Sequence, residues 1–430
     1  MGYTSIKNIV EKMQSFESEG DLFSLKHQGK EYYDLIRYEL FHKIAMRSNL
    51  FAEAHPKPKK FFWYFDLVFK DLFALSQSLR ALKNKTNWVF PLYRKTNAID
   101  IHSHNYIEGC DSTAIIDSSF SNQKYFGAAS FDFIFLICTF LAKLFSSATY
   151  FLFSLTDKEK DLCKSSKISA TEYSQLVVFK LIQHKMLVIF YRLLLLKNKP
   201  ERVYVVGAYY RKYILDAAFQ LDIETIELQH GLYSKYHLGY SYPEEFNIQY
   251  QPKKLYIYGE HWRLPNILAK SIETKVIGKD HLRNYSNKNT LKSGILICSQ
   301  AVIREELLEI SIRLAKENPG ESFRLKPHPS DKTEYPKVVP PNLEILEPDA
   351  DSYNLMEKSE IQIGSYSTTL LEGLYYGTPF IVLDLAGSEY FDEILEKAGK
   401  KKVSPIGDLN SFLEQKIDMD HRHFFAEFHY

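Results

Sequence analysis

The 430-residue sequence has little cysteine and almost no net charge. Its four cysteines stand far apart and form no CxxC pair, which argues against a structural zinc site or a disulfide framework and fits reduced cytoplasmic thiols. They are Cys110, Cys138, Cys163 and Cys298. The formal net charge is +1, so no global field attracts nucleic acid, and any anionic ligand must be held by a local site.

An apolar leader and an uninterrupted membrane span are also missing. Residues 1–21 are mixed and polar, without the apolar centre of a signal peptide. In the apolar stretch 131–153, Asp132 and Lys143 intervene, so we expect a buried or interfacial helix rather than a span. The stretch 187–196 is flanked by Lys and Arg, and it predicts a core helix, with contact to an anionic leaflet as the alternative. We expect a cytoplasmic protein that either is free or lies peripherally on the inner face of the cell membrane.

The two halves of the chain differ in pattern. Residues 1–200 are mainly helical in periodicity, whereas short β-rich runs alternate with helical segments from residue 201 onward. Such alternation predicts parallel sheets with right-handed crossovers. We predict an α/β protein with two Rossmann-like doubly wound domains at 1–280 and 293–430, joined by a polar linker and facing a cleft. Locally, we expect an exposed loop at 157–170 and a helix at 261–270.

The loops that follow strands carry the first candidate motif. In such sheets, ligands bind at the loops after the strands. The segment Arg324-Leu-Lys-Pro-His-Pro-Ser330 follows a predicted strand, and its two prolines stiffen the backbone around His328. A rigid imidazole with Lys326 beside it can hold a phosphate, although a simple strand-ending turn would look the same.

A second motif begins a helix. It runs from Gly364 to Pro379 and has hydroxyl residues where a strand passes into a helix. A helix N-terminus offers free N–H groups and a partial positive charge, which suit phosphate. Glu372 lies one turn deeper and could bind a ribose diol. Plain capping, with Thr369 and Glu372 as a capping box, is the alternative. The hydroxyl residues concerned are Ser365, Ser367, Thr368 and Thr369.

A third motif, Glu227-Leu-Gln-His230-Gly231, follows a predicted strand of the N-terminal domain. Gly231 permits a tight turn, and His230 would face the cleft opposite His328. The alternative is a turn with an incidental histidine.

A fourth feature is Asp100-Ile-His102-Ser-His104. In an extended segment these three side chains would share a face. One interpretation is a metal site of a hydrolase, and a second is that Asp100 acts as the base on an acceptor hydroxyl. The third is a polar loop without a function in catalysis.

The first three motifs together resemble those of bacterial surface-polysaccharide transferases of GT-B architecture. The QHG, KPHP and SxSTxxxEGxxxGTP patterns are similar to those of capsule Kdo transferases, polysialyltransferases and CDP-glycerol or CDP-ribitol polyol-phosphate transferases, over residues 203–385. The resemblance implies that His328, Ser367 and Thr368 hold the phosphates of a nucleotide donor and that Glu372 holds its ribose. It also makes His230 a catalytic candidate. Lys326 and Ser365 adjoin these positions and join the donor-site candidates.

The leading hypothesis is therefore transfer of a sugar, such as Kdo from a CMP-linked donor, onto a capsule, O-antigen or lipopolysaccharide glycan. Asp100, Glu227 and His230 are the candidate catalytic residues. We do not recognise the DxD metal motif of the other main transferase architecture, so no metal or cofactor is expected beyond the CMP- or CDP-linked donor. The expected partners are that donor and a glycan or lipid-linked glycan acceptor. The alternatives are a polyol-phosphate transferase, a metal-dependent hydrolase using Asp100, His102 and His104, and a non-catalytic glycan-binding protein.

Overall fold

The structure is a computed structural model of the whole chain. It describes residues 5–50, 69–92, 100–107, 112–118, 125–243, 248–264, 267–285, 291–329, 331 and 333–427. Cys110 lies outside these ranges, and the other three cysteines are buried free thiols.

The first domain is built on a six-stranded, fully parallel sheet with the order β4-β3-β5-β6-β7-β8. Helices cover it, and apolar side chains of the strands and the helices form one core between them. This core includes Trp88 and Val205 of the sheet and Leu187 and Ile214 of the helices. The strands are β3 (Asn87–Phe90), β4 (Thr113–Ile115), β5 (Arg202–Val206), β6 (Glu224–Leu228), β7 (Lys254–Ile257) and β8 (Glu273–Val276). The helices are α4 (Leu75–Ala81), α5 (Asp132–Thr149), α7 (Ala170–Asn198) and α8 (Lys212–Phe219).

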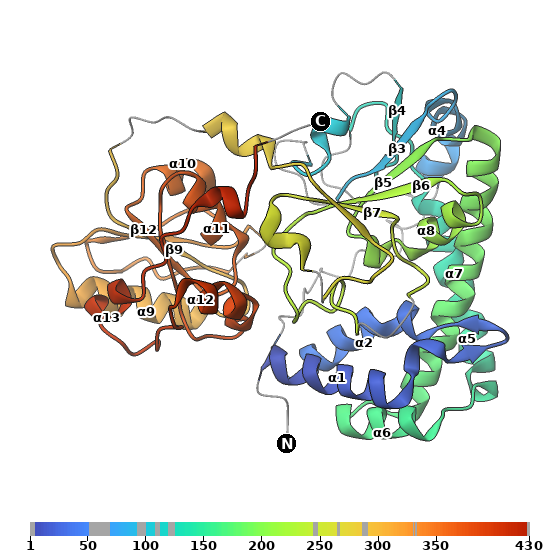
Figure 1. Cartoon of the computed structure of the whole chain (residues 1–430), viewed down its shortest axis with the longest axis horizontal. Coiled ribbons are helices and arrows are strands. Elements are labelled where there is room, and N and C mark those ends of the chain that lie inside the picture. The colour runs from blue at the N-terminus through green and yellow to red at the C-terminus, as the bar shows by residue number, and fades with distance from the viewer. Residues whose placement is uncertain are drawn as a thin grey trace.

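A helical layer extends the first domain below its sheet (Figure 1). It packs around the N-terminal part of α7 with an apolar core of its own. Inside it, the Arg37 guanidinium donates to the Glu17 carboxylate at 2.7 Å and to the Leu238 carbonyl at 2.6 Å. The layer comprises α1 (Ile6–Gly20), α2 (Tyr33–Arg47), α6 (Asp157–Ser166) and the hairpin β1 (Lys26–His27) and β2 (Lys30–Glu31).

The second domain has a five-stranded parallel sheet with the order β11-β10-β9-β12-β13. This is a doubly wound arrangement, in which the order of the strands along the chain reverses between β9 and β12, and such sheets bind ligands at that point. The strands are β9 (Ile295–Cys298), β10 (Phe323–Lys326), β11 (Leu343–Ile345), β12 (Ile361–Gly364) and β13 (Phe380–Val382). The helices are α9 (Arg304–Glu317), α10 (Ser352–Glu357), α11 (Thr368–Tyr375), α12 (Asp392–Ala398) and α13 (Leu409–Glu414).

Two parallel sheets in two lobes confirm the predicted α/β fold of GT-B type, with a helix-rich N-terminal half (Figure 1). Short 3-10 turns link the main elements. They are η1 (Leu22–Ser24), η2 (His104–Tyr106), η3 (Tyr150–Leu152), η4 (Ala208–Tyr210), η5 (Glu260–Arg263), η6 (Asp280–Tyr285), η7 (Ser388–Phe391) and η8 (His421–His423).

Two local predictions are wrong. The expected loop at 157–170 contains α6, because Thr156 and Glu159 form a capping box that starts a helix. The expected helix at 261–270 is only the short turn η5, which ends at Leu264 in a left-handed conformation with φ of 35°. The polar run read as a linker begins with η6, and residues 286–290 lie outside the described ranges.

The chain returns to the first domain near its C-terminal end. The Trp262 indole N–H donates to the Phe424 carbonyl at 2.9 Å, and the Ala426 N–H donates to the Tyr258 carbonyl at 2.8 Å. Residues 421–427, placed by sequence in the second domain, therefore also contact the first, while the His421 ring stays 5.0 Å from the Tyr375 ring of α11.

Candidate functional site

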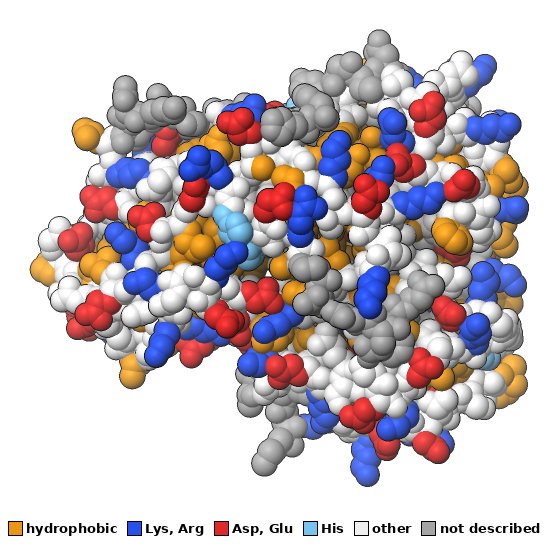
Figure 2. Space-filling view, in the orientation of Figure 1, with side chains coloured by type: hydrophobic (Ala, Val, Ile, Leu, Met, Phe, Trp, Pro, Cys, Tyr) orange, Lys and Arg blue, Asp and Glu red, His pale blue; other side chains and the backbone are white. Residues whose placement is uncertain are grey.

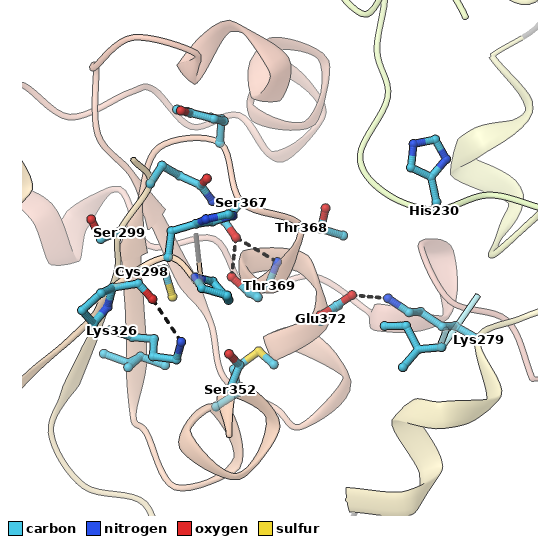
Figure 3. A pocket seen from close by; sticks show the side chains of 18 of the residues that line it. His230, Lys279, Cys298, Ser299, Lys326, Ser352, Ser367, Thr368, Thr369 and Glu372 are labelled. Carbon is cyan, nitrogen blue, oxygen red and sulfur yellow. Dashed lines mark hydrogen bonds and ion pairs between the residues drawn. The ribbon is translucent and has the colours of Figure 1, made fainter. Parts of the chain in front are cut away.

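A cavity of about 370 Å³ lies where loops of the two domains meet. Its volume falls within the range of small-molecule sites. The first domain contributes Ile101, His102, His230 and Lys279 to its lining. The second domain contributes Leu296, Cys298, Ser299, Gln300, Lys326, Pro327, His328, Pro329, Ser352, Met356, Tyr366, Ser367, Thr368, Thr369 and Glu372. The cavity thus occupies the carboxyl edges of β9, β10 and β12, including the reversal point of the second sheet (Figure 3).

The KPHP loop forms one wall of this cavity. His328 lies directly after β10 and lines the cavity, as predicted. The Lys326 ammonium donates to the carbonyls of Pro327 at 3.0 Å and Pro348 at 2.6 Å, and burial lowers its pKa. Lys326 therefore stabilises its own loop, because its ammonium binds two backbone carbonyls beside the cavity.

The start of α11 forms the adjoining wall. Ser367 is the N-cap, and its hydroxyl accepts from the Thr369 N–H at 3.4 Å and lies 2.6 Å from the Thr369 hydroxyl. The hydroxyls of Ser367 and Thr369 lie together at this helix start, beside the cavity (Figure 3), where a helix N-terminus also offers N–H donors. The expected capping box between Thr369 and Glu372 is not formed, because Ser367 takes the capping position.

Two donor-site candidates have side chains that already bind other groups of the protein. Ser365 is fully buried, donates toward the carbonyls of Leu385 and Ala386, and does not line the cavity. Glu372 does line it, but its carboxylate forms a buried ion pair with the Lys279 ammonium from the opposite domain (Figure 3).

Lys279 is a site residue that sequence reasoning missed. It lies at the start of the run read as a linker, yet it follows β8 closely, so the strand-end rule could have found it. Its ammonium also lies 4.9 Å from the centre of the Tyr258 ring, where the ring face attracts a cation.

The QHG loop faces these elements from the first domain. Gln229 fixes the loop, since its side chain donates to the Gly231 carbonyl at 3.0 Å and accepts from the Tyr258 N–H at 2.8 Å. The next N–H, that of Leu232, donates to the Thr368 hydroxyl at 3.1 Å. The QHG loop and the hydroxyl-rich start of α11, 136 residues apart in sequence, therefore touch across the domain boundary.

The His230 imidazole is held in one tautomer. The Tyr240 hydroxyl donates to the Glu227 carboxylate at 2.7 Å and lies 3.1 Å from His230 Nδ1. Because that hydroxyl donates its hydrogen bond to Glu227, it accepts from Nδ1–H, which leaves a lone pair on Nε2. The Tyr209 hydroxyl lies 3.2 Å from Nε2. Burial lowers the pKa of His230 well below its ordinary value, so the ring is neutral.

Glu227 supports this histidine from behind and does not line the cavity. Burial raises its pKa to about 7 even though Tyr240 and the N–H of Ala208 donate to it. Its predicted role as a base acting directly on a substrate does not fit this position.

His102 is a second neutral imidazole at the cavity. Its Nδ1 lies 2.6 Å from the Tyr258 hydroxyl, which itself donates to the Gln229 carbonyl at 2.5 Å. Burial, with Lys279 nearby, lowers the pKa of His102 well below its ordinary value. The rings of His102 and His230 lie 6.3 Å apart.

Asp100, unlike His102, does not reach the cavity. The segment is a turn leading into η2 rather than an extended strand, so Asp100, His102 and His104 do not share a face. The buried Asp100 carboxylate accepts from the N–H of Leu92 at 3.2 Å and from the Ser103 hydroxyl at 2.5 Å, and burial raises its pKa. It anchors its turn and does not line the cavity.

Acidic metal ligands do not gather at the cavity. Within the described part of the chain, no group of three His, Cys, Asp or Glu side chains is arranged to hold a metal ion. Contrary to the expected absence of a DxD motif, DxD triplets do occur at 349–351 and 418–420. Asp351 caps α10 and Asp420 caps η8, and neither lines the cavity.

Comparison with known proteins gives only distant structural likeness. No protein-family model matches the chain, and no curated protein matches it. The chain is similar to a UDP-GlcNAc 2-epimerase from Neisseria meningitidis bound to UDP-GlcNAc, with 17% identity, a TM-score of 0.43, and coverage of 77% of this chain and 89% of that one. It is also similar to the spinosyn rhamnosyltransferase SpnG, solved with thymidine diphosphate as well, with 12% identity, a TM-score of 0.45, and coverage of 79% and 89%. Since these TM-scores are below 0.5, the fold assignment rests on the strand order described above.

Proposed function

We propose that the chain is a glycosyltransferase that moves a sugar from a CMP- or CDP-linked donor onto a capsule, O-antigen or lipopolysaccharide glycan. One observation carries the proposal: His328 and the hydroxyl-rich start of α11 share a cavity with His230 and His102 from the other domain. Phosphate-binding groups and proton-accepting groups therefore face each other across a space of small-molecule size.

The second domain would hold the donor phosphates. The free N–H groups of α11, the hydroxyls of Ser367 and Thr369, and the His328 imidazole can all donate to phosphate oxygens. These donors are fixed before the substrate arrives, so they stabilise the charge that develops on the leaving nucleotide at little reorganisation cost. This arrangement needs no divalent ion, and we expect activity to survive EDTA.

The first domain would activate the acceptor. His230 lines the cavity and is neutral, as a general base requires, and its Nε2 lone pair lies within 3.2 Å of the Tyr209 hydroxyl. Deprotonation of an acceptor hydroxyl would place a positive charge on the ring, and the Tyr240–Glu227 chain stabilises that charge. We therefore assign the base to His230 rather than to Asp100 or Glu227.

Polyol-phosphate transfer is the second candidate. The same phosphate-binding wall and the same histidines would serve an attack at phosphorus, and His230 occupies the position that the motif resemblance links to that reaction. Product analysis separates the two: a phosphodiester in the polymer selects polyol-phosphate transfer, a glycosidic bond selects sugar transfer, and an epimerised donor without transfer contradicts both.

Nucleotide binding tests the donor site directly. CMP, CDP, UDP and GDP, with their sugar conjugates, are screened by thermal shift, because a ligand raises apparent stability by mass action. We expect a cytidine nucleotide to give the largest shift. His328→Ala should weaken its binding roughly 10- to 150-fold by calorimetry and abolish turnover, since charge-assisted contacts to phosphate contribute roughly 1.5–3 kcal/mol.

The matched control is His27→Ala, which changes a histidine of the β1–β2 hairpin outside the cavity. It should bind nucleotide as the wild type does. Unchanged CMP, CDP and UDP binding in His328→Ala would remove the phosphate role.

A further inference from the structure

The helices α5 and α7 expose large apolar side chains that are not buried in the core of the first domain. Phe140 is 68% exposed and Leu193 is 61% exposed. Large contiguous apolar surfaces are rare on soluble monomers and mark interaction sites. We call this surface the α5–α7 face; it comprises Ile137, Phe140, Leu144 and Phe145 of α5, Phe151 and Leu152 of η3, and Ile189, Leu193 and Leu196 of α7.

The two helices lie side by side and antiparallel. Gln183 of α7 donates to the Thr139 hydroxyl of α5 at 2.7 Å, and the rings of Phe131 and Phe190 are 5.5 Å apart. Their inner sides are already satisfied, since Cys138 and Leu187 are buried in the core of the first domain. The exposed apolar side chains therefore take no part in the packing that holds the two helices against the domain.

The charged side chains that α5, η3 and α7 carry between their first turns and their ends are all basic. Residues 133–156 and 173–199 contain no Asp or Glu. Lys180 pairs with Glu39, whereas the other basic side chains have no acidic partner within the described residues. Those other basic residues are Lys143, Lys185, Arg192, Lys197 and Lys199. Figure 2 shows hydrophobic and basic side chains together along the edge of the molecule where Figure 1 places α7.

We propose that the α5–α7 face rests on the surface of an anionic lipid bilayer. Apolar side chains enter the headgroup boundary while lysine and arginine reach the lipid phosphates, and each basic residue contributes about 1 kcal/mol near such a surface. This inference does not depend on the proposed reaction.

A lipid surface fits better than a membrane span. By length and composition, α5 with η3 is the one described helix that could cross a bilayer. Crossing would pull Phe133 and Cys138 out of the core that they share with Leu187 of α7. Lying flat keeps that core and still covers the exposed side chains.

Vesicle co-sedimentation tests the face. The full chain is mixed with vesicles of phosphatidylcholine alone or of phosphatidylcholine with phosphatidylglycerol, and binding is expected only with the anionic lipid. Phe140→Glu with Leu193→Glu should weaken that binding at least about tenfold. The matched control is Val338→Glu with Ile406→Glu, at side chains 90% and 88% exposed in the second domain, which should bind as the wild type does.

A second variant tests the charges. Replacement of Lys185, Arg192 and Lys197 by Gln should weaken binding to anionic vesicles and reduce its sensitivity to salt. Unchanged melting temperature and unchanged nucleotide-induced thermal shift confirm that each variant is folded.

Three outcomes would overturn the proposal. The first is failure of the folded wild type to bind anionic vesicles. The second is equal loss of binding in the control variant. The third is protein that stays in the vesicles after alkaline extraction, which indicates a span. If light scattering instead shows a dimer that only the face variant disrupts, with vesicle binding unchanged, the face is covered by a second copy.

Discussion

At the residue scale, the His230 imidazole depends on two side chains that do not reach the cavity. Tyr240 joins His230 to Glu227 and so determines which ring nitrogen carries the proton. A tyrosine to phenylalanine change removes this link and leaves the ring in place.

Tyr240→Phe should therefore lower kcat on the order of 100-fold, because the base loses its tautomer and its charge stabilisation. The KM for the donor should change little, since the donor wall belongs to the other domain. Tyr233→Phe is the matched control: Tyr233 is equally buried and stacks on Tyr240 at 4.5 Å, but its hydroxyl has no hydrogen-bond partner among the described residues. Equal losses in the two variants would show that the effect is one of packing.

Glu227 should also make stability depend on pH. Burial raises its pKa from 4.5 to about 7, so between these values the folded chain keeps a proton that the unfolded chain has released. The free energy of unfolding therefore falls as pH rises through this window, by about 3 kcal/mol relative to a group that does not titrate.

Glu227→Gln, measured by urea unfolding from pH 4 to 8, should lose this slope. The free energy of unfolding of the wild type should fall more from pH 4 to pH 8 than that of the variant. Parallel curves for the two proteins would show that Glu227 does not titrate with a raised pKa.

Residue types near strand ends were predictable, but their partners were not. His230, His328, Ser367 and Thr368 line one cavity, as expected from motifs that follow strands. The burial of Asp100 could not be predicted. Its carboxylate accepts hydrogen bonds from Leu92 and Ser103 in a turn, and the alternating sequence pattern does not reveal that turn. Which residues of the cavity bind substrate stays a prediction.

At the element scale, the glycine after Glu372 explains how α11 is seated. A Cβ at Gly373 would lie 1.7 Å from the Gln362 side chain of β12 and 3.1 Å from the Thr378 carbonyl. The helix can approach the sheet only because this position has no side chain.

Gly373→Ala should therefore push α11 away from β12, cost roughly 1–3 kcal/mol of stability, and weaken nucleotide binding at the displaced helix start. Gly320→Ala is the control, since a Cβ there has nothing within 4 Å. Urea unfolding and calorimetry measure the two effects. A stable Gly373→Ala protein with normal binding would show that Gln362 simply moves aside.

Elements with strong periodicity were predictable, and short ones were not. The central strands β9 and β12 match the apolar runs because both are buried on both faces. The helix α6 was read as a loop because its charged composition hid the Thr156–Glu159 capping box. The η5 segment was read as a helix because composition does not reveal the backbone turn at Leu264.

At the scale of the whole molecule, the Lys279–Glu372 pair joins the two domains beside the cavity. Both side chains are buried, at 4% and 5% exposure, so removal of one leaves the other charged without a partner.

Lys279→Met and Glu372→Gln should each lower the free energy of unfolding by roughly 3–5 kcal/mol, and the double variant should lose less than the sum. Asp222→Asn is the control, because it breaks an exposed pair with Lys253 and should cost at most about 1 kcal/mol. Additive losses in the cycle would mean that the two charges are not coupled.

The two-domain plan was predictable from the alternation of strands and helices, whereas the way the domains join was not. Contacts such as Leu232 to Thr368 and Lys279 to Glu372 connect residues far apart in sequence, and no local pattern marks them.

The return of residues 421–427 to the first domain has a consequence for how the protein is made. Trp262 reaches its partner at Phe424 only after the entire second domain has been synthesised. The first domain therefore leaves the ribosome with an uncovered tryptophan and an open hydrogen-bonding edge at Tyr258. Its maturation is tied to that of its neighbour, so a nascent chain arrested before residue 420 should engage chaperones and proteases that the finished chain escapes.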